Sequence, residues 1–430
     1  MTSYKKAELH LDDKIINLQI VTGTDGRQGL DIKSLYENSG MITVDPGNFN
    51  TAIGESSVSR RDPEKGTLSY RGYDVADLAR NSSFVETSYL LIYGELPKKN
   101  ELEDFTKRLS KHSMIHEDMI NLFDGFPGKA NPLAVLSTML MALSSYYTDD
   151  YEESVDRGVD QVTRLLSKIR TIAAFSYKKM IGQPFVYPKD NLPYCSNFLH
   201  MLFTIPAESE NFPVSEKLDR ILNQFWILYA DHEQNVAAST VQLVGSTKAN
   251  LFASIAAGIS ALWGSREGGQ SEAAMELIEK IIASKKSVPD YLSDPKIQAE
   301  LSKSNFLGHS AYITKSPRSV IARELFHAYF ASERSTVLDV ALEVESFIDS
   351  NAFYKDKNLY TNLEFYSAIL FNSMGIPKNM FTVMQTIGKL PGWLAHWREL
   401  RIKSNFKKAR PRQIYVGAMH KVYSSIDKRS

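Results

Sequence analysis

The sequence predicts a mainly α-helical protein with a short β-rich segment at its N-terminus. From about residue 74 onward, apolar residues recur at helical spacing, as in EKLDRILNQFWILY at 216–229, which is typical of a helix with one buried face. Residues 7–23 instead alternate apolar and polar side chains, and the turn-forming sequence DGRQG follows them. The sequence has no repeat of fixed period, so we expect no repeat architecture.

Capping and breaking residues place individual elements. Asp74 is the expected N-cap of a helix that starts VADLARN, and Gly94 is expected to end the following helix. Residues 40–52 and 66–74 are expected to form short strands or extended segments. The polar stretches 283–295 and 350–362 are interpreted as connections within one lobe.

The composition excludes several classes of protein. Lys plus Arg equals Asp plus Glu at 50 each, so the net charge favours neither nucleic acid nor a membrane as a partner. The most apolar stretches, 131–147 and 250–264, fall short of an uninterrupted membrane span and are interpreted as buried helices. One cysteine, Cys195, and an N-terminus without the apolar core of a signal peptide predict a cytoplasmic protein.

Ionisable residues gather where predicted helices break. In WGSREGGQSEAA, residues 263–274, a charged pair precedes two glycines, and Glu267 is either a solvated helix-end charge or part of a site. His309 follows a glycine, and taken alone it is more often a structural histidine than a catalytic one. Arg318 follows Pro317 at a loop–helix junction, where a pair of cationic side chains suits an anion.

Two further ends of predicted helices contain ionisable residues, His232 and Glu364. His232 lies in YADHEQN, but Val236 occupies the position four residues later and binds no metal, so we predict no metal site. Glu364 lies among apolar residues near a helix start, with Asn362 as the expected cap. Such a carboxylate either points outward or is buried with a partner.

Several motifs resemble those of the citrate synthase family in order and spacing. They are ADHEQN, GSTKANLFASIAAGISALWG with its following Gly-Gly, GH…SPR, FYSAILFNSMGIPKNMFTV, GWLAHWREL and ARPRQIYVG. The N-terminal DPGNFNTAIGESSVSRRDPEKGTLSYRGYD is similar to the bacterial subtype that carries an extra β-rich segment. The resemblance covers nearly the whole chain.

The resemblance implies a large helical domain and a small mobile helical domain. The large domain would comprise 51–265 with 376–430, and the small domain 266–375, after a β-rich segment at 1–50. The ligand would be a small carboxylate or oxo acid in the cleft between the domains, and no cofactor would be required. A CoA thioester as substrate stays open, because Ile313 stands where the family has a basic residue while Lys315 lies nearby.

Three site residues of the family match this sequence. The histidine that binds the keto group corresponds to His309, and an arginine that clamps a carboxylate of oxaloacetate corresponds to Arg318. Arg410, in ARPRQ, corresponds to the arginine that reaches the site from the partner subunit, in a homodimer or a hexamer.

Four other positions depart from the family pattern. Glu267 replaces the histidine of the HGG motif, and Glu364 replaces the catalytic aspartate. Tyr229 replaces a histidine that binds oxaloacetate, and Lys389 replaces a second clamping arginine. Lysine keeps the charge but loses the bidentate fork, and an ionised Glu267 would repel an enolate unless it were protonated.

Three hypotheses follow from this mixture. The first is an enzyme that acts on an oxo acid or carboxylate by altered condensation, cleavage or cyclisation, with Glu267 and Glu364 as an acid–base pair. The second is a catalytically inactive member of the family with a binding or assembly role. The third is citrate synthase itself, which condenses acetyl-CoA with oxaloacetate.

Overall fold

A computed structural model describes most of the chain, and these residues fall into two compact units. The described residues are 6–11, 14–147, 155–205, 215–264, 266–402 and 407–429. The smaller unit comprises Met1–Glu55 with Lys408–Ser430, and the larger comprises Ser56–Lys407.

The smaller unit is built on a three-stranded antiparallel sheet. Its elements are β1 (Lys6–Leu11), β2 (Lys14–Thr22), β3 (Gln28–Asp31), α1 (Leu35–Ser39) and the 3-10 turn η3 (Ile426–Lys428). The strand order is β1-β2-β3. Ile16 and Leu18 point from one face of β2 and bury Leu35 of α1, which is the alternation of side chains that the sequence predicted here.

The larger unit is helical apart from one small sheet. Its elements are β4 (Ser59–Asp62), β5 (Thr67–Tyr70), β6 (Tyr73–Asp74), α2 (Val75–Asn81), α3 (Phe84–Tyr93), α4 (Lys99–Lys111), α5 (Asp118–Asp124), α6 (Pro132–Leu143), α7 (Val155–Met180), α8 (Tyr194–Phe203), α9 (Glu216–Tyr229), α10 (Val236–Gly245), α11 (Leu251–Leu262), α12 (Gln270–Ser284), α13 (Val288–Leu292), α14 (Pro295–Leu301), α15 (Pro317–Phe330), α16 (Thr336–Ser350), α17 (Ala352–Asp356), α18 (Leu363–Ser373), η2 (Lys378–Met380) and α19 (Phe381–Ile402).

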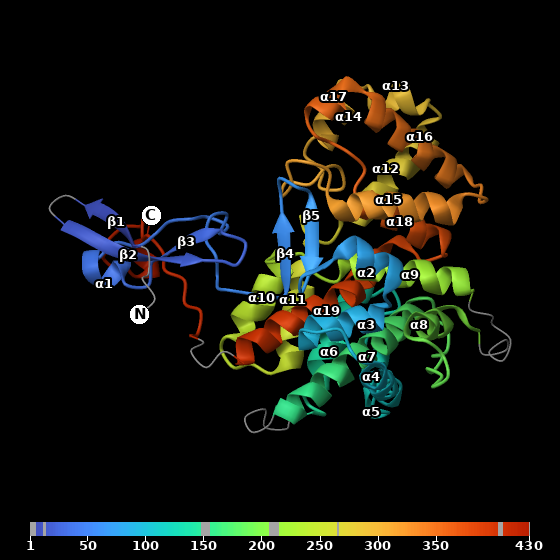
Figure 1. The fold of residues 1–430 in the computed structure, drawn as a ribbon, viewed down its shortest axis with the longest axis horizontal. Coiled ribbons are helices and arrows are strands. Elements are labelled where there is room, and N and C mark those ends of the chain that lie inside the picture. Colours follow the sequence, from blue (N-terminus) through green and yellow to red (C-terminus); the bar gives the residue numbers. More distant parts are fainter. Residues whose placement is uncertain are drawn as a thin grey trace. The chain divides into compact units, whose positions relative to one another are not determined.

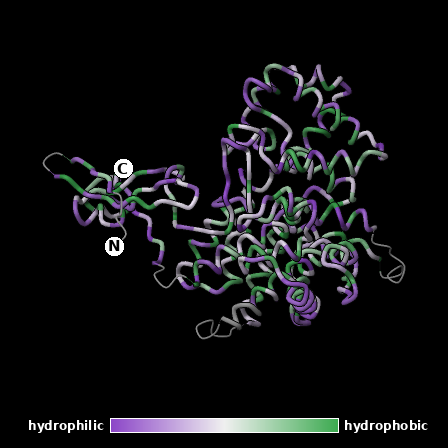
Figure 2. Tube along the Cα trace, viewed as in Figure 1, coloured by the Kyte–Doolittle hydropathy of each residue, from purple (hydrophilic) through white to green (hydrophobic). Residues whose placement is uncertain are grey.

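Helix α19 is the centre of the larger unit. It packs against α3, α9, α10 and α11, and it is buried along most of its length. Three tryptophans, Trp226, Trp393 and Trp397, are among the largest fully buried side chains of this core. Hydrophobic segments concentrate where these helices meet, whereas α4 at the edge is largely hydrophilic (Figure 2).

A second group of helices lies at one end of the larger unit. Helices α13, α14, α16 and α17 gather there, with α12, α15 and α18 between them and the α19 core (Figure 1). Helix α12 packs against α16 and α18, and α15 packs against α18. Six of the seven candidate site residues belong to this unit: Arg318, Glu364, Tyr229 and Lys389 lie on α15, α18, α9 and α19, and Glu267 and His309 lie on the segments that lead to α12 and α15.

The structure confirms the mainly helical fold and most of the predicted helix ends. The Asp74 carboxylate accepts a hydrogen bond from the amide of Ala76, and Gly94 ends α3 with a left-handed backbone. The polar stretches 283–295 and 350–362 differ from the predicted connections, because they contain α13, the start of α14, and α17. Ser287 caps α13 and Pro289 lies in its first turn, so local capping chemistry explains this difference.

Within the described residues, none of the helices is both long enough and apolar enough to cross a membrane. The stretches at 131–147 and 250–264 form α6 and α11, which pack against each other.

Candidate active site

The segment that joins α11 to α12 is a tight turn packed against α19. The amides of Glu267 and Gly268 both donate to the carbonyl oxygen of Gly264, at 2.9 and 3.1 Å. A Cβ atom at Gly268 would overlap the carbonyl oxygen of Leu262 and would lie 2.9 Å from Cγ2 of Thr382. Packing therefore requires a glycine here, and the turn carries Glu267 as a half-buried side chain.

His309 and Arg318 meet at the start of α15. Nε2 of His309 lies 3.3 Å from a terminal guanidinium nitrogen of Arg318, and its Nδ1 accepts a hydrogen bond from the amide of Ala311 at 3.2 Å. Burial first, and then the charges of Arg318 and Arg61, lower the pKa of His309 to about 3. The ring is therefore neutral at pH 7. Because Nδ1 is the acceptor, we assign the proton to Nε2.

The two facing nitrogens are consequently both hydrogen-bond donors. The Nε2–H of His309 and the N–H of Arg318 cannot satisfy each other, so both require an acceptor oxygen close by. Carboxylate and keto oxygens are acceptors of this kind. The pair is thus arranged for a ligand that carries such oxygens.

Arg318 also lacks a carboxylate partner among the described residues. Its side chain is 6% exposed, it forms no ion pair there, and its Nε has no hydrogen-bond partner. A buried guanidinium without a counter-charge is costly. Because Arg318 lies in the first turn of α15, the helix dipole adds to the preference for an anion.

A second histidine, His232, lies beside His309. The ring centroids are 4.9 Å apart, and Nε2 of His232 lies 3.1 Å from the hydroxyl oxygen of Tyr312. Burial first, and then nearby positive charges led by Arg318, lower the pKa of His232 well below its ordinary value. The sequence indicated His232 only as a possible metal ligand, which was rejected, and it gave no indication of Tyr312 or Arg61. The one available signal was the place of His232 within the YADHEQN motif.

Lys389 lies in the electrostatic field of three other site residues. Burial lowers the pKa of Lys389, the carboxylates of Glu267 and Glu364 act in the opposite direction, and Arg318 lowers it further. Asn362 caps α18 by accepting hydrogen bonds from its first amides, and Glu364 stands in that first turn. Within the described residues, the side chains of Lys389, Glu267 and Glu364 form no hydrogen bond or ion pair.

Tyr229 is bound into a chain of hydroxyl groups. Its hydroxyl lies 2.6 Å from Oγ of Ser367, which lies 3.1 Å from Oγ of Ser271, and Gln385 donates to Ser271 at 2.7 Å. This chain links α9, α18, α12 and α19. Burial first, and then the charge of Glu364, raise the pKa of Tyr229, so its hydroxyl is neutral. Tyr229 therefore connects α18, which carries Glu364, with α12, which follows the turn that carries Glu267.

Hydrogen-bond contacts and electrostatic effects thus connect six of the seven predicted site residues within the larger unit. The seventh, Arg410, is exposed and belongs to the C-terminal segment of the smaller unit, so its predicted role across a subunit interface stays a prediction. Ile313, the position that weakened the CoA assignment, is 72% exposed on the loop that follows His309.

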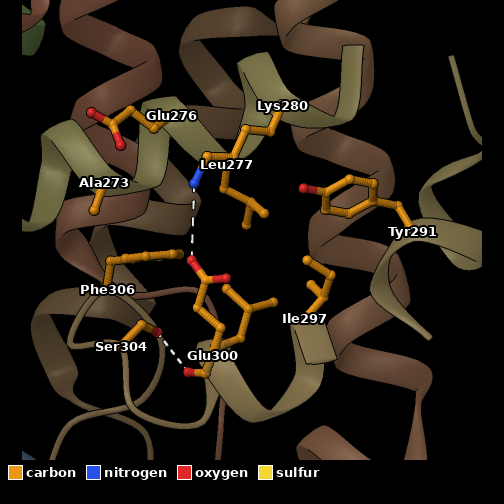
Figure 3. Close-up of a pocket in the computed structure, with 10 residues that line it drawn as sticks. Ala273, Glu276, Leu277, Lys280, Tyr291, Ile297, Glu300, Ser304 and Phe306 are labelled. Atoms are coloured by element: carbon orange, nitrogen blue, oxygen red, sulfur yellow. Dashed lines mark hydrogen bonds and ion pairs between the residues drawn. The ribbon is translucent and has the colours of Figure 1, made fainter. Parts of the chain in front are cut away.

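A separate small cavity lies under α12. Its volume is about 90 Å³, and its lining includes Leu277, Lys280, Tyr291 and Phe306 (Figure 3). None of the residues that line it is a predicted site residue. Pockets for metabolites usually span several hundred Å³, so this cavity is no substitute for the site around Arg318.

Comparison with known proteins identifies the family. The family model described as citrate synthase, C-terminal domain, matches residues 47–412. Two curated relatives, each named citrate synthase 1 and from two strains of Mycobacterium tuberculosis, are 42% identical over 417 residues, which is 96% of each chain. The chain belongs to the citrate synthase family.

Solved structures agree with this family assignment. A citrate synthase from Pyrobaculum aerophilum is 28% identical with a TM-score of 0.77, covering 95% of this chain and 97% of its own. A citrate synthase from Thermoplasma acidophilum, solved as a ternary complex with carboxymethyl coenzyme A and oxaloacetate, is 26% identical with a TM-score of 0.80. It covers 90% of this chain and 100% of its own. These relatives, all named citrate synthase, support an enzymatic role for this chain.

Proposed function

We propose that this chain forms a carbon–carbon bond between a 2-oxo acid and an acyl donor, with the oxo acid held at the start of α15. The observation that carries the proposal is the contact between Nε2 of His309 and the buried guanidinium of Arg318, and with the tautomer assigned above both groups present N–H donors to a ligand. The buried, unpaired guanidinium of Arg318 would bind the carboxylate. The Nε2–H of His309 would donate to the keto oxygen.

In this proposal Glu364 is the general base. It would take a proton from the carbon next to the donor carbonyl, and that carbon would attack the keto carbon of the oxo acid. The keto oxygen gains negative charge as the bond forms, and the neutral His309 ring stabilises it by donating a hydrogen bond. Glu364 is suited to this role because its first-turn position on α18 is fixed by the Asn362 cap.

The first candidate pair of substrates is oxaloacetate and acetyl-CoA, whose condensation would give citryl-CoA, which water would then hydrolyse to citrate and CoA. Identity of 42% over 96% of the chain to proteins named citrate synthase 1 favours it. The proposal includes a cytoplasmic location and an oligomer in which Arg410 reaches the site of a neighbouring subunit.

The second candidate is altered chemistry on another carboxylate, by condensation, cleavage or cyclisation. It is favoured because the charges of Glu267 and Glu364 both act on Lys389, while none of the three side chains forms a hydrogen bond or ion pair among the described residues. Two neighbouring carboxylates can divide the roles of acid and base between them. Glu267 would then be the proton donor and Glu364 the base.

One assay separates these candidates. Purified protein is incubated with oxaloacetate and acetyl-CoA, and citrate is quantified for the wild type, Glu364→Gln and the control Glu300→Gln, whose carboxylate is exposed away from the site. The first candidate predicts citrate formation that Glu364→Gln lowers by at least about 100-fold and Glu300→Gln leaves intact.

A negative result leads to a second measurement. If no citrate forms, other 2-oxo acids are tested with and without acyl donors, and the second candidate predicts a turnover that both Glu267→Gln and Glu364→Gln abolish. Oxo-acid binding by calorimetry without any turnover would indicate an inactive family member, and it would refute both candidates.

A further inference from the structure

Residues 360–362, termed here the positioning segment, contact two loops of the candidate site through Tyr360. The carbonyl oxygen of Tyr360 accepts a hydrogen bond from the amide of Gly308 at 2.7 Å. Its hydroxyl oxygen accepts another from the amide of Ser316 at 2.8 Å. Gly308 directly precedes the histidine of the site, and Ser316 lies two residues before its arginine. One residue therefore holds the backbone beside both groups.

Asn362 extends these contacts to the helix that carries the proposed base. Its side-chain nitrogen donates to the carbonyl oxygens of Asn305 and Gly308 at 2.9 and 3.1 Å. Its side-chain oxygen accepts hydrogen bonds from the amides of Glu364 and Phe365 at 3.1 and 3.3 Å. Asn362 is buried, so these bonds are shielded from water. The positioning segment thus contacts the backbone beside all three groups of the proposed reaction.

Thr361, the middle residue of the segment, is held by a chain of buried side chains. Its hydroxyl oxygen lies 2.7 Å from that of Tyr366, which donates to the carboxylate of Glu345 at 2.8 Å. Burial first, and then the charge of Glu345, raise the pKa of Tyr366, so its hydroxyl keeps its proton at pH 7. Because a carboxylate only accepts hydrogen bonds, this single proton points to Glu345. The hydroxyl of Thr361 is then the donor in its contact with Tyr366.

Glu345 is itself fixed by two side chains of α15. Arg323 forms an ion pair with Oε1 of Glu345, and Nε2 of His327 lies 2.9 Å from Oε2. The Glu345 side chain is 3% exposed. A buried carboxylate whose two oxygens are both bonded is held in one place, because breaking any of its bonds leaves a buried charge unpaired. Glu345 therefore fixes the hydroxyl of Tyr366 relative to α15 and α16.

The contact between Thr361 and Tyr366 spans the first turn of α18. Glu364 lies between these two residues in the sequence, so their hydrogen bond closes a loop around it. We propose that the hydroxyl pair of Thr361 and Tyr366 positions Glu364 for proton abstraction. Both are positioning residues, because they act through Glu364. This inference rests on the proposed function, since it takes Glu364 as the base and places the oxo acid at His309 and Arg318.

Loss of the hydroxyl pair should slow the reaction without weakening the binding of the oxo acid. A base must stay within hydrogen-bond reach of its proton, and a misplacement of about 1 Å can cost about 100-fold in rate. The Asn362 cap remains when the pair is lost, so we expect a smaller fall in kcat, of about 10-fold. Tyr360 still holds the loops before His309 and Arg318, so the dissociation constant of the oxo acid should stay within about two-fold.

Variants of the hydroxyl pair and one matched control test this inference. Thr361→Val and Tyr366→Phe, made singly and together, each remove one hydroxyl group, and Thr361→Ser keeps it. The control is Tyr354→Phe, because the Tyr354 hydroxyl is also buried and donates to the carbonyl oxygen of Leu292 at 2.9 Å. The kcat and KM are measured with oxaloacetate and acetyl-CoA, or with another 2-oxo acid that the wild type turns over. Calorimetry gives the dissociation constant of the oxo acid, and urea unfolding gives the stability.

The two single variants that lack a hydroxyl should each lower kcat about 10-fold, and Thr361→Ser should keep most of the wild-type rate. The double variant should be no slower than the slower single variant, within about two-fold, because both substitutions remove the same bond. Tyr354→Phe should lose a similar amount of stability, since it also loses one buried hydrogen bond, but it should keep the wild-type kcat.

An equal fall in kcat in Tyr354→Phe would attribute the effect to general destabilisation and overturn the positioning role. Unchanged kcat in Thr361→Val and Tyr366→Phe, or losses that multiply in the double variant, would also overturn it and leave the proposed function intact. A wild type that turns over no 2-oxo acid would overturn the proposed function and this inference together.

Discussion

The neutral His309 ring makes a quantitative prediction about stability at acid pH. A histidine whose pKa is about 3 in the folded protein and about 6.5 in the unfolded chain binds its proton first in the unfolded state. Stability is therefore undiminished above pH 6.5 and is lost as the pH falls below that value, down to the folded pKa. The charged groups that act on the ring are Arg318 and Arg61.

The size of the loss follows from the two pKa values. At pH 5, protonated histidine outnumbers neutral histidine about thirty-fold in the unfolded chain, while the folded ring is still neutral. Each pH unit below the unfolded pKa is worth about 1.4 kcal/mol of stability. The contribution of His309 is then about 2 kcal/mol. Because the ring is partly exposed, we expect about 1 to 2 kcal/mol after solvent screening.

The assay compares the wild type with His309→Gln, which keeps a polar side chain but does not titrate. The free energy of unfolding is measured in urea at about pH 7.5 and pH 5, at one protein concentration since assembly shifts apparent stability. The wild type should lose about 1 to 2 kcal/mol more than the variant over this interval. Parallel losses in the two proteins would refute the buried neutral ring and the donor assignment built on it.

Three further substitutions test packing and charge at the site. Gly268→Ala should lower the midpoint of thermal unfolding through a clash worth about 1 to 3 kcal/mol, whereas Gly264→Ala, whose Cβ would meet its nearest atom at 3.9 Å, should not. Tyr229→Phe should cost about 1 kcal/mol in urea unfolding by leaving Ser367 without this partner, and a change below the error would contradict the hydroxyl chain. Arg318→Met should weaken oxaloacetate binding in calorimetry by about 100-fold without loss of stability, and unchanged binding would exclude Arg318 as the carboxylate ligand.

Local signals in the sequence account for much of the fold. Asp74, Gly94 and Asn362 end or begin helices as predicted, because capping depends on a few neighbouring residues. The short helix at Val288–Leu292 was missed although Ser287 caps it, since the polar composition of that stretch outweighed the capping signal in the interpretation.

The sequence predicted which residues belong to the site, but it did not predict how they are arranged. The motif resemblance identified His309, Arg318 and Lys389, yet it gave no reason to expect two facing donors or an unpaired lysine. Arg61 was missed altogether, because it acts on His309 only after the β4–β5 hairpin packs beside the loop that carries the histidine. Such contacts join distant parts of the chain and leave no local pattern.

The charges gathered around Lys389 limit the kind of ligand that the site accepts. In formal charges, Arg318 and Lys389 balance Glu267 and Glu364, because both histidines nearby are neutral. Arg410 belongs to the smaller unit. Within the larger unit, a ligand with two carboxylates therefore adds negative charge, and we expect a bound proton to offset part of it.

Oxaloacetate should therefore take up more protons on binding than pyruvate, by up to about one proton per site. Calorimetry in two buffers with different heats of ionisation measures this number directly. Equal proton uptake for the two ligands would mean that a further cation reaches the site. If oxaloacetate then took up more protons than pyruvate in Arg410→Gln, that cation would be Arg410.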